Sequence, residues 1–110
     1  MNLPNRENAT IPEAKITEYL LSDSHRDGQH RAAIFRRFGY SLSAWQRLRD
    51  DLLEHSNYEV TKVESSPFGT RYVIEGIIQA PDGRQPRIRT VWFIENDSDA
   101  PRLATAYPAE

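Results

Sequence analysis

Arginine, threonine and aromatic residues recur inside strand-like segments in the C-terminal half of this chain. They stand in three short runs: Gly69–Tyr72, Arg89–Trp92 and Arg102–Pro108. A guanidinium group can bind a phosphate in bidentate fashion and a hydroxyl group can hydrogen-bond it, so these residue types are suited to holding and cleaving a phosphodiester. Because core strands have no need of arginine, a sheet that carries these runs presents either a solvated outer face or a binding site.

The composition excludes several classes of protein. The chain has 110 residues, of which 38% are hydrophobic and 27% charged, and this is enough for one compact domain. It contains no cysteine, so disulfides, thiolate metal sites and cysteine nucleophiles are excluded, and its three histidines lack metal-ligand spacing. Glycine-rich phosphate loops and the Gly-x-Ser-x-Gly motif are also absent from the sequence. We therefore expect neither a metal nor another cofactor.

Hydropathy and charge limit the partners. No apolar run approaches the roughly 20 residues that span a bilayer, and the N-terminus lacks the apolar core of a signal peptide, so we expect a cytoplasmic protein with no membrane partner. The formal net charge is −2, yet residues 25–37 contain four arginines and two histidines against one acidic residue. Arginine outnumbers lysine twelve to two, which favours phosphate or carboxylate ligands, although the base composition of a GC-rich genome would also explain it.

The period of the hydrophobic pattern changes at Asn57, from helical before it to alternating after it. Residues 1–10 are polar and are predicted to form a flexible arm, and residues 11–110 a single domain. The spacing predicts helices over about 12–21, 28–38 and 44–56, and strands over about 58–64, 71–79, 87–95 and 102–107. The predicted fold is α+β, with three N-terminal helices packed on one face of a four-stranded antiparallel sheet.

Local signals place two helix boundaries and one helix face. Ser43-x-x-Gln46 is a capping box that predicts the start of the third helix. Gly39 is expected to end the second helix in the left-handed conformation. The third helix should bury Leu48 and expose Arg49.

The Asp82-Gly83 pair is a strong hairpin signal between the second and third predicted strands. If these two residues form a two-residue turn, Glu75 lies opposite Thr90 and Ile74 opposite Val91. The face with Ile74 and Val91 carries more apolar bulk, so we expect the helices on it. Three side chains then lie on the open face: Glu75, Thr90 and Trp92. A longer loop or a bulge would reverse this assignment.

The chain is predicted to have three helices followed by a four-stranded meander, with His25 in the loop before a basic helix and with the three runs described above. In this combination it resembles a family of small uncharacterised bacterial proteins. The resemblance covers residues 11–108. That family is in turn similar to the barnase/EndoU/colicin/RelE-like toxin nucleases in its helix-then-sheet order, its compact size and a terminal strand with Thr105 and Tyr107.

The resemblance implies a metal-independent endoribonuclease, in which the ribose 2′-hydroxyl attacks the adjacent phosphorus and protein groups move two protons. His25 is the first choice for base or acid, and Glu75, beside two arginines, is the alternative base. The implied catalytic set is His25, Arg31, Glu75, Thr105 and Tyr107. The implied nucleic-acid-binding set is Arg26, His30, Arg89, Trp92 and Arg102, with Trp92 stacking on a base.

RNA is the partner that this reading implies, together with a cognate antitoxin or immunity protein that holds a toxin inactive. Each residue also has an ordinary explanation. His25 suits a surface loop or a helix cap, and His55 suits the end of the third helix, where it would complement the helix dipole. Tyr107 and Trp92 suit packing against the sheet.

Two non-catalytic functions stay open. In the first, the protein is an interaction module, such as the neutralising half of a toxin pair, and its acidic composition favours this slightly. In the second, it binds nucleic acid without catalysis through residues 25–37 and three further arginines: Arg84, Arg87 and Arg89. Convergence of His25, Arg31, Glu75, Arg89 and Thr105 in one concave site would favour an enzyme.

Overall fold

The computed structural model of the protein describes residues 1–22 and 29–109, and for residues 29–31 it describes the backbone alone. Along these residues the helices are α1 (Glu13–Lys15), continued by a π-helical turn over Ile16–Leu20, then α2 (Gln29–Arg37) and α3 (Trp45–His55). The strands are β1 (Val60–Ser66), β2 (Gly69–Ile77), β3 (Arg87–Glu95) and β4 (Arg102–Pro108).

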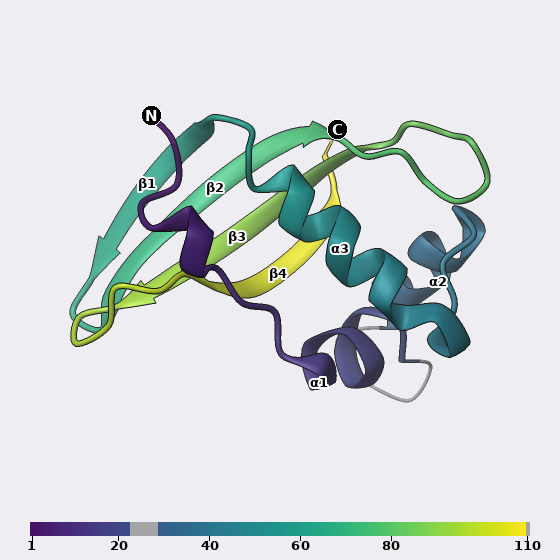
Figure 1. Ribbon diagram of the computed structural model, residues 1–110, viewed down its shortest axis with the longest axis horizontal. Helices are drawn as coiled ribbons and strands as arrows, with labels where there is room; N and C mark the ends of the chain where they lie inside the picture. The colour runs from purple at the N-terminus through teal and green to yellow at the C-terminus, as the bar shows by residue number, and fades with distance from the viewer. Residues whose placement is uncertain (23–28, 110) are drawn as a thin grey trace.

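The four strands form one antiparallel sheet in which each strand pairs with its neighbour in the sequence, in the order β1-β2-β3-β4 (Figure 1). Such a meander needs only hairpin connections, which agrees with the alternating pattern after Asn57. The α+β class, with three helices and a four-stranded antiparallel sheet, is confirmed.

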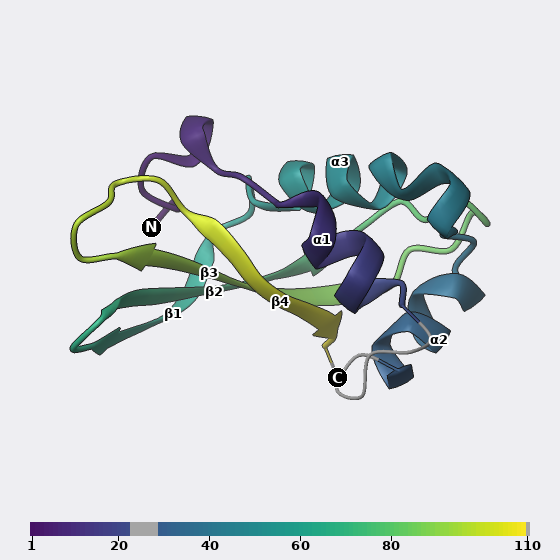
Figure 2. The ribbon, with the colours of Figure 1, turned by 90° about the horizontal axis from the view of Figure 1, so that it is seen from below.

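The helices do not all lie on one face of the sheet. α1 and α3 cover one face, and no described helix covers the other (Figure 2). α2 lies beyond the end of the sheet, beside the loop between β2 and β3 (Figure 1). There the Asp82 amide donates a hydrogen bond to the Phe38 carbonyl, just after α2, at 3.1 Å. The prediction that three helices pack on one face of the sheet is therefore correct for α1 and α3 and wrong for α2.

The hydrophobic core lies between the covered face of the sheet, α3 and the helical turn after α1. Removing apolar side chains from water supplies the main favourable free energy of folding. The fully buried hydrophobic residues of this core include Ile16, Leu20, Phe35, Leu48, Leu52, Ile74, Ile88, Trp92 and Leu103.

The start of α3 differs from the prediction. The chain enters this helix through a 3-10 turn, Leu42–Ala44, and no side chain caps either element. Ser43 is already inside that turn, and its hydroxyl lies 3.2 Å from the hydroxyl of Ser41. The predicted capping box is therefore wrong, whereas Gly39 has the expected left-handed conformation after α2, with φ of 101°.

The pairing of β2 with β3 is shifted by one residue from the prediction, because the turn is not the assumed two-residue turn. The Gly83 amide bonds to the Ala80 carbonyl at 3.0 Å, so Pro81 and Asp82 are the central residues of the turn. Gly83 follows with φ of 90°. This is the three-residue hairpin loop, a turn followed by a left-handed glycine, in which proline suits the first central position.

The shift exchanges the two faces of β3. Glu75 lies opposite Arg89, and Ile74 lies opposite Thr90. Thr90 and Trp92 are fully buried beneath the helices, so the prediction that they lie on the open face is wrong. Glu75 lies on the open face as predicted, and Arg89 joins it there.

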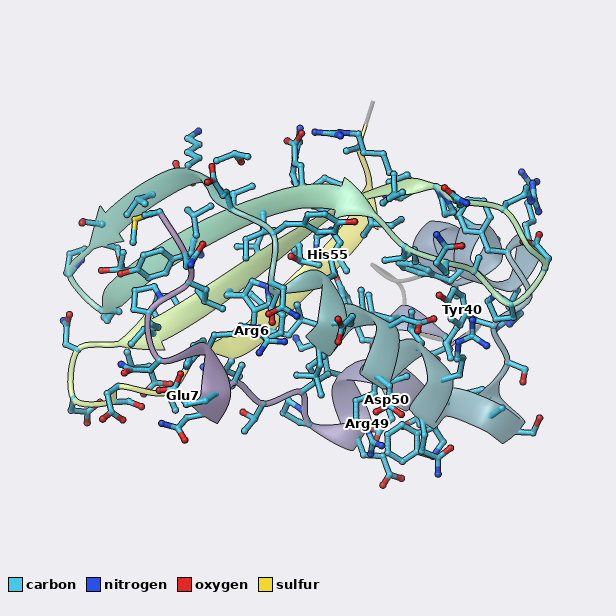
Figure 3. All side chains as sticks on the ribbon, turned by 45° about the horizontal axis from the view of Figure 1, so that its top comes forward. Arg6, Glu7, Tyr40, Arg49, Asp50 and His55 are labelled. Carbon is cyan, nitrogen blue, oxygen red and sulfur yellow. The ribbon has the colours of Figure 1, made fainter. Side chains whose placement is uncertain are left out.

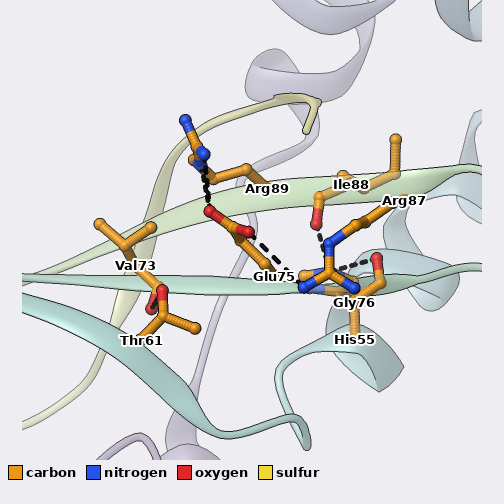
Figure 4. Close-up of polar contacts among 8 residues, drawn as sticks. All are labelled: His55, Thr61, Val73, Glu75, Gly76, Arg87, Ile88 and Arg89. Atoms are coloured by element: carbon orange, nitrogen blue, oxygen red, sulfur yellow. Dashed lines mark hydrogen bonds and ion pairs between the residues drawn. The ribbon is translucent and has the colours of Figure 1, made fainter. Parts of the chain in front are cut away.

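His55 connects α3 to the sheet. It is buried, and its Nε2–H donates to the carbonyl oxygens of Gly76 (3.2 Å) and Ile88 (2.9 Å), which are cross-strand partners (Figures 3 and 4). Its Nδ1 accepts from the Thr90 hydroxyl at 3.2 Å, which accepts from Trp92 Nε1–H at 3.0 Å. We assign the hydrogens in this way because both nitrogens of His55, the Thr90 hydroxyl and the Trp92 indole N–H then each have a hydrogen-bond partner.

Burial is the largest cause that lowers the pKa of His55, and the charge of Arg87 lowers it further. The imidazole is therefore neutral at pH 7, and it does not complement the helix dipole as a cation. The ring of Tyr58 packs edge-on against the imidazole at 5.4 Å between centroids.

Residues 1–10, predicted to form a flexible arm, make defined contacts. Leu3 is buried in the core. The Val60 amide bonds to the Met1 carbonyl at 2.8 Å, and Thr10 forms an isolated bridge with Arg102. The segment thus extends from the start of β1 to the start of β4 across the covered side of the sheet (Figure 1).

Two truncations in the core and one outside it test the assignment of the α3 faces. Leu48→Ala and Ile74→Ala should each lower the free energy of unfolding by about 2–5 kcal/mol, because each leaves a cavity. Arg49→Ala should change it by less than about 0.5 kcal/mol, since Arg49 points away from the sheet (Figure 3) and pairs with an exposed Asp50. Urea unfolding followed by circular dichroism measures all three, and equal losses at Leu48 and Arg49 would contradict the assignment.

The buried imidazole predicts acid sensitivity. In the unfolded chain His55 takes up a proton below about pH 6.5, whereas the folded protein resists protonation, so the free energy of unfolding should fall as the pH drops through that value. Urea titrations at about pH 7.5 and pH 5.5 measure the fall. His55→Asn should be less stable at the higher pH and should show a smaller fall. A variant that keeps the whole pH dependence would show that His55 is not its source.

Candidate functional site

The open face of the sheet contains a groove of about 720 Å³. All four strands contribute to it, so the backbone pairing of the sheet positions the described side chains that line it. Its lining side chains are Thr61, Lys62, Glu64, Arg71, Val73, Glu75, Arg89, Val91, Ala104, Thr105 and Tyr107.

Glu75 is the central acidic group of this groove. Arg89 Nε and Nη2 lie 2.7 and 2.6 Å from Glu75 Oε2, and Arg87 Nη2 lies 3.6 Å from Oε1 (Figure 4). The Glu75 and Arg89 side chains are partly buried, with 21% and 34% of their surface exposed. A ligand that enters the groove can therefore reach both the carboxylate and the guanidinium.

Tyr107 lies opposite Arg89 across β3 and β4. The Arg89 guanidinium lies 5.6 Å from the centre of the Tyr107 ring. The pKa of Arg89 is raised, first by its contact with the Tyr107 hydroxyl and then by that with the Glu75 carboxylate. Arg89 is thus a permanent cation held between a carboxylate and a phenol.

Thr105 lies on the same face of β4, opposite Val91. Its hydroxyl lies 3.4 Å from the hydroxyl of Tyr19, at the edge of the sheet beside the helical turn after α1. A hydroxyl in this position can donate to an anion in the groove or accept from Tyr19.

Arg71 projects from β2 into the same groove. The residue is exposed, and its guanidinium makes no hydrogen bond or ion pair with the described side chains, those of residues 1–22 and 32–109. A cation without an acidic partner raises the local positive potential and is available to an anionic ligand.

The structure brings together four of the predicted site residues: Glu75, Arg89, Thr105 and Tyr107. Arg102 lies in an adjacent groove and pairs with Glu95 at 2.9 Å. Trp92 is fully buried, so its ring offers no face to a base and its predicted stacking role is wrong.

Four other candidates remain predictions. His25 and Arg26 lie outside the described residues, and so do the side chains of His30 and Arg31.

Sequence reasoning missed Arg71 and Phe93 as site residues. Arg71 lies on the same face of β2 as Glu75 by alternation, and the correct register would have placed Phe93 opposite it. The signal for Arg71 was present in the Gly69–Tyr72 run, whereas that for Phe93 depended on the turn geometry.

Two properties of the described residues limit the chemistry. Residues 1–22 and 29–109 contain no group of three or more histidine, aspartate and glutamate residues arranged to hold a metal ion. Within the same ranges, every helix is too short or too polar to cross a membrane. The groove offers a carboxylate, hydroxyl groups and cations, which are sufficient for proton transfer beside a phosphate.

Residues 2–110 match the family model described as Domain of unknown function (DUF6883). The match agrees with the resemblance to a family without an assigned function. No curated protein matches the sequence.

The fold is similar to that of a solved chain from the "Contact-dependent growth inhibition toxin - immunity protein complex from Klebsiella pneumoniae 342". The TM-score is 0.73, and the similarity covers 96% of this chain and 97% of that chain. The two sequences are 14% identical, so the comparison shows a shared fold.

Proposed function

The chain belongs to the DUF6883 family, and we propose that it is a toxin-like, metal-independent endoribonuclease that cleaves RNA through attack by the ribose 2′-hydroxyl. The observation that carries the proposal is the convergence of a carboxylate, two cations and two hydroxyl groups in one groove: Glu75, Arg89, Arg71, Thr105 and Tyr107. These are the groups that such a reaction requires.

In the proposed reaction Glu75 accepts the proton of the 2′-hydroxyl. The 2′-oxygen then bonds to phosphorus, the bond to the 5′-oxygen breaks, and Tyr107 donates a proton to that leaving oxygen. The products are a 2′,3′-cyclic phosphate and a 5′-hydroxyl. Arg89 and Arg71 offset the charge that builds up on the phosphorane, and Thr105 hydrogen-bonds one of its oxygens.

Arg89 has a second task in this proposal. In the free protein it binds Glu75 through a single carboxylate oxygen, which leaves Oε1 facing the weaker contact with Arg87 at 3.6 Å. A phosphate that binds Arg89 would draw the guanidinium toward itself and free the carboxylate to act as base. His25 and Arg31 remain additional candidates for acid and cation.

The similar structure is a complex of a toxin with an immunity protein, and this similarity supports a toxin-related role for this chain as a proposal. A cognate immunity protein would inhibit this ribonuclease most directly by covering the open face. The alternative is that this chain is itself the neutralising partner. That role has no need of a carboxylate, cations and hydroxyl groups in one groove, so we favour the nuclease.

The proposal predicts the effect of changes in the groove. Glu75→Gln and Arg89→Ala should each lower the rate of RNA cleavage by about 10²-fold or more, the usual loss when proton transfer or charge stabilisation is removed. Tyr107→Phe should lower it in the same range if the phenol is the acid. The purified protein is incubated with total RNA in excess chelator, and the product ends are analysed for 2′,3′-cyclic phosphate.

Arg49→Ala is the matched control, because this arginine lies on the outer side of α3 and away from the groove (Figure 3). It should cleave RNA at the wild-type rate, and all variants should keep the wild-type melting temperature within a few degrees. Full activity in both Glu75→Gln and Arg89→Ala would move the site elsewhere. A wild-type protein that cuts no RNA but binds a toxin tightly would favour the neutralising role.

A further inference from the structure

A second groove, of about 660 Å³, runs beside β4 next to α1. Lys15 and Tyr19 border it on the helical side, and Phe93 and Arg102 border it on the side of the sheet. Arg71 and Ala104 line both this groove and the Glu75–Arg89 groove. The two hollows are therefore neighbours that meet at these residues.

A β-bulge in β4 lies at the junction. Val91 pairs with Thr105 and Trp92 pairs with Leu103, which leaves Ala104 without a partner in β3. Bulges bend a strand and redirect its side chains, and they are frequent next to active sites. Because the residue at the bulge is alanine, β4 contributes only a methyl group where the two grooves join.

Phe93 offers an aromatic surface beside this junction. It lies on the open face opposite Arg71 and is partly exposed. Its ring lies against Gly69, since a Cβ there would stand 2.7 Å from Phe93 Cζ. The Cζ edge of the ring thus packs near the bare backbone of Gly69, and the side chain also borders the second groove.

The cations along this path are open to exchange. Arg71 makes no ion pair with the described residues, as noted above. Arg102 pairs with Glu95 at 2.9 Å, but the two side chains are 53% and 46% exposed. A phosphate can replace a carboxylate in a pair this solvated at little cost.

We infer, resting on the ribonuclease proposed above, that the substrate is single-stranded RNA whose chain continues from the cleavage groove past Ala104 into the second groove. Phe93 stacks one base there, and Arg71 and Arg102 bind the adjoining phosphates. The path turns around the edge of the sheet and takes up an unstacked base. An A-form duplex keeps its bases stacked and paired, and it cannot follow that path.

Binding of a non-cleavable strand tests the inference apart from catalysis. The probe is a fluorescent single strand of about twelve 2′-O-methyl nucleotides of mixed sequence, a length within the usual range for such sites. Phe93→Leu, which removes the aromatic face, and Ala104→Leu, which fills the junction, should each weaken binding by about tenfold. Phe93→Tyr should bind the probe with the wild-type affinity, because tyrosine keeps the aromatic face. The duplex form of the probe should bind about tenfold more weakly than the single strand.

Ala33→Leu is the matched control, because it adds the same bulk at an exposed position of α2. It should bind like the wild type. Cleavage of a dinucleotide, which is too short to reach the second groove, should be unchanged in Ala33→Leu and lost in Glu75→Gln. The wild-type affinity in Phe93→Leu, or equal affinity for duplex and single strand, overturns the inference.

The two proposals fail in different ways. If Glu75→Gln cleaves normally while Phe93→Leu loses binding, the proposed catalytic role is wrong and the binding path stands. If Glu75→Gln loses cleavage while both junction variants bind normally, the catalytic role stands and the binding path is wrong.

Discussion

Glu75 and Arg89 are cross-strand partners, and the arrangement of both faces of the sheet depends on that pairing. A slip of one residue between β2 and β3 would turn every side chain of one strand to the opposite face. Trp92 would then enter solvent and Arg89 would enter the core. Burying an unpaired guanidinium and exposing an indole would both cost free energy. The observed register avoids both costs and allows the hydrophobic core to form.

Two features at the loop end of β2 and β3 hold this register. At the loop, Pro81 and Gly83 suit a turn that adds one residue to the simplest hairpin. Beneath the sheet, His55 donates to carbonyl oxygens of both strands, and Thr90 and Trp92 satisfy its other nitrogen in series. A buried network of this kind is stable only when every member has a partner, so it disfavours any shifted pairing.

The two faces of the same strands therefore have different electrostatics. Beneath the covered face, the polar atoms of the neutral His55–Thr90–Trp92 network are hydrogen-bonded, because a charge at that position would lose its hydration without compensation. The open face keeps its charges in contact with water, where they retain their charge and can change partners. Since these groups stand on paired strands, their spacing is fixed before a ligand binds, which favours stabilisation of a developing charge.

The sequence by itself determined the class of the fold and the position of most elements. The change of period at Asn57 separated helices from strands, and burial of Leu48 and Ile74 followed from spacing along each element. Such patterns are local, because a helix or strand repeats within a few residues and must bury one face. The presence of Glu75, Thr105 and Tyr107 in one groove was also within reach, since alternation places them on the same face of their strands once that face is known.

Tertiary structure alone decided which face of β3 and β4 is covered by helices and which is open. The Asp82-Gly83 pair favoured a tighter turn than the one that forms, and a difference of one residue reversed the positions of Trp92 and Phe93. The bulge at Ala104 and the packing of α2 against the β2–β3 loop likewise depend on contacts between segments distant in the sequence. The physical reason is that the backbone geometry of a turn sets the register of the strands that it joins. Which turn forms depends on how favourable a hydrophobic core the resulting register allows.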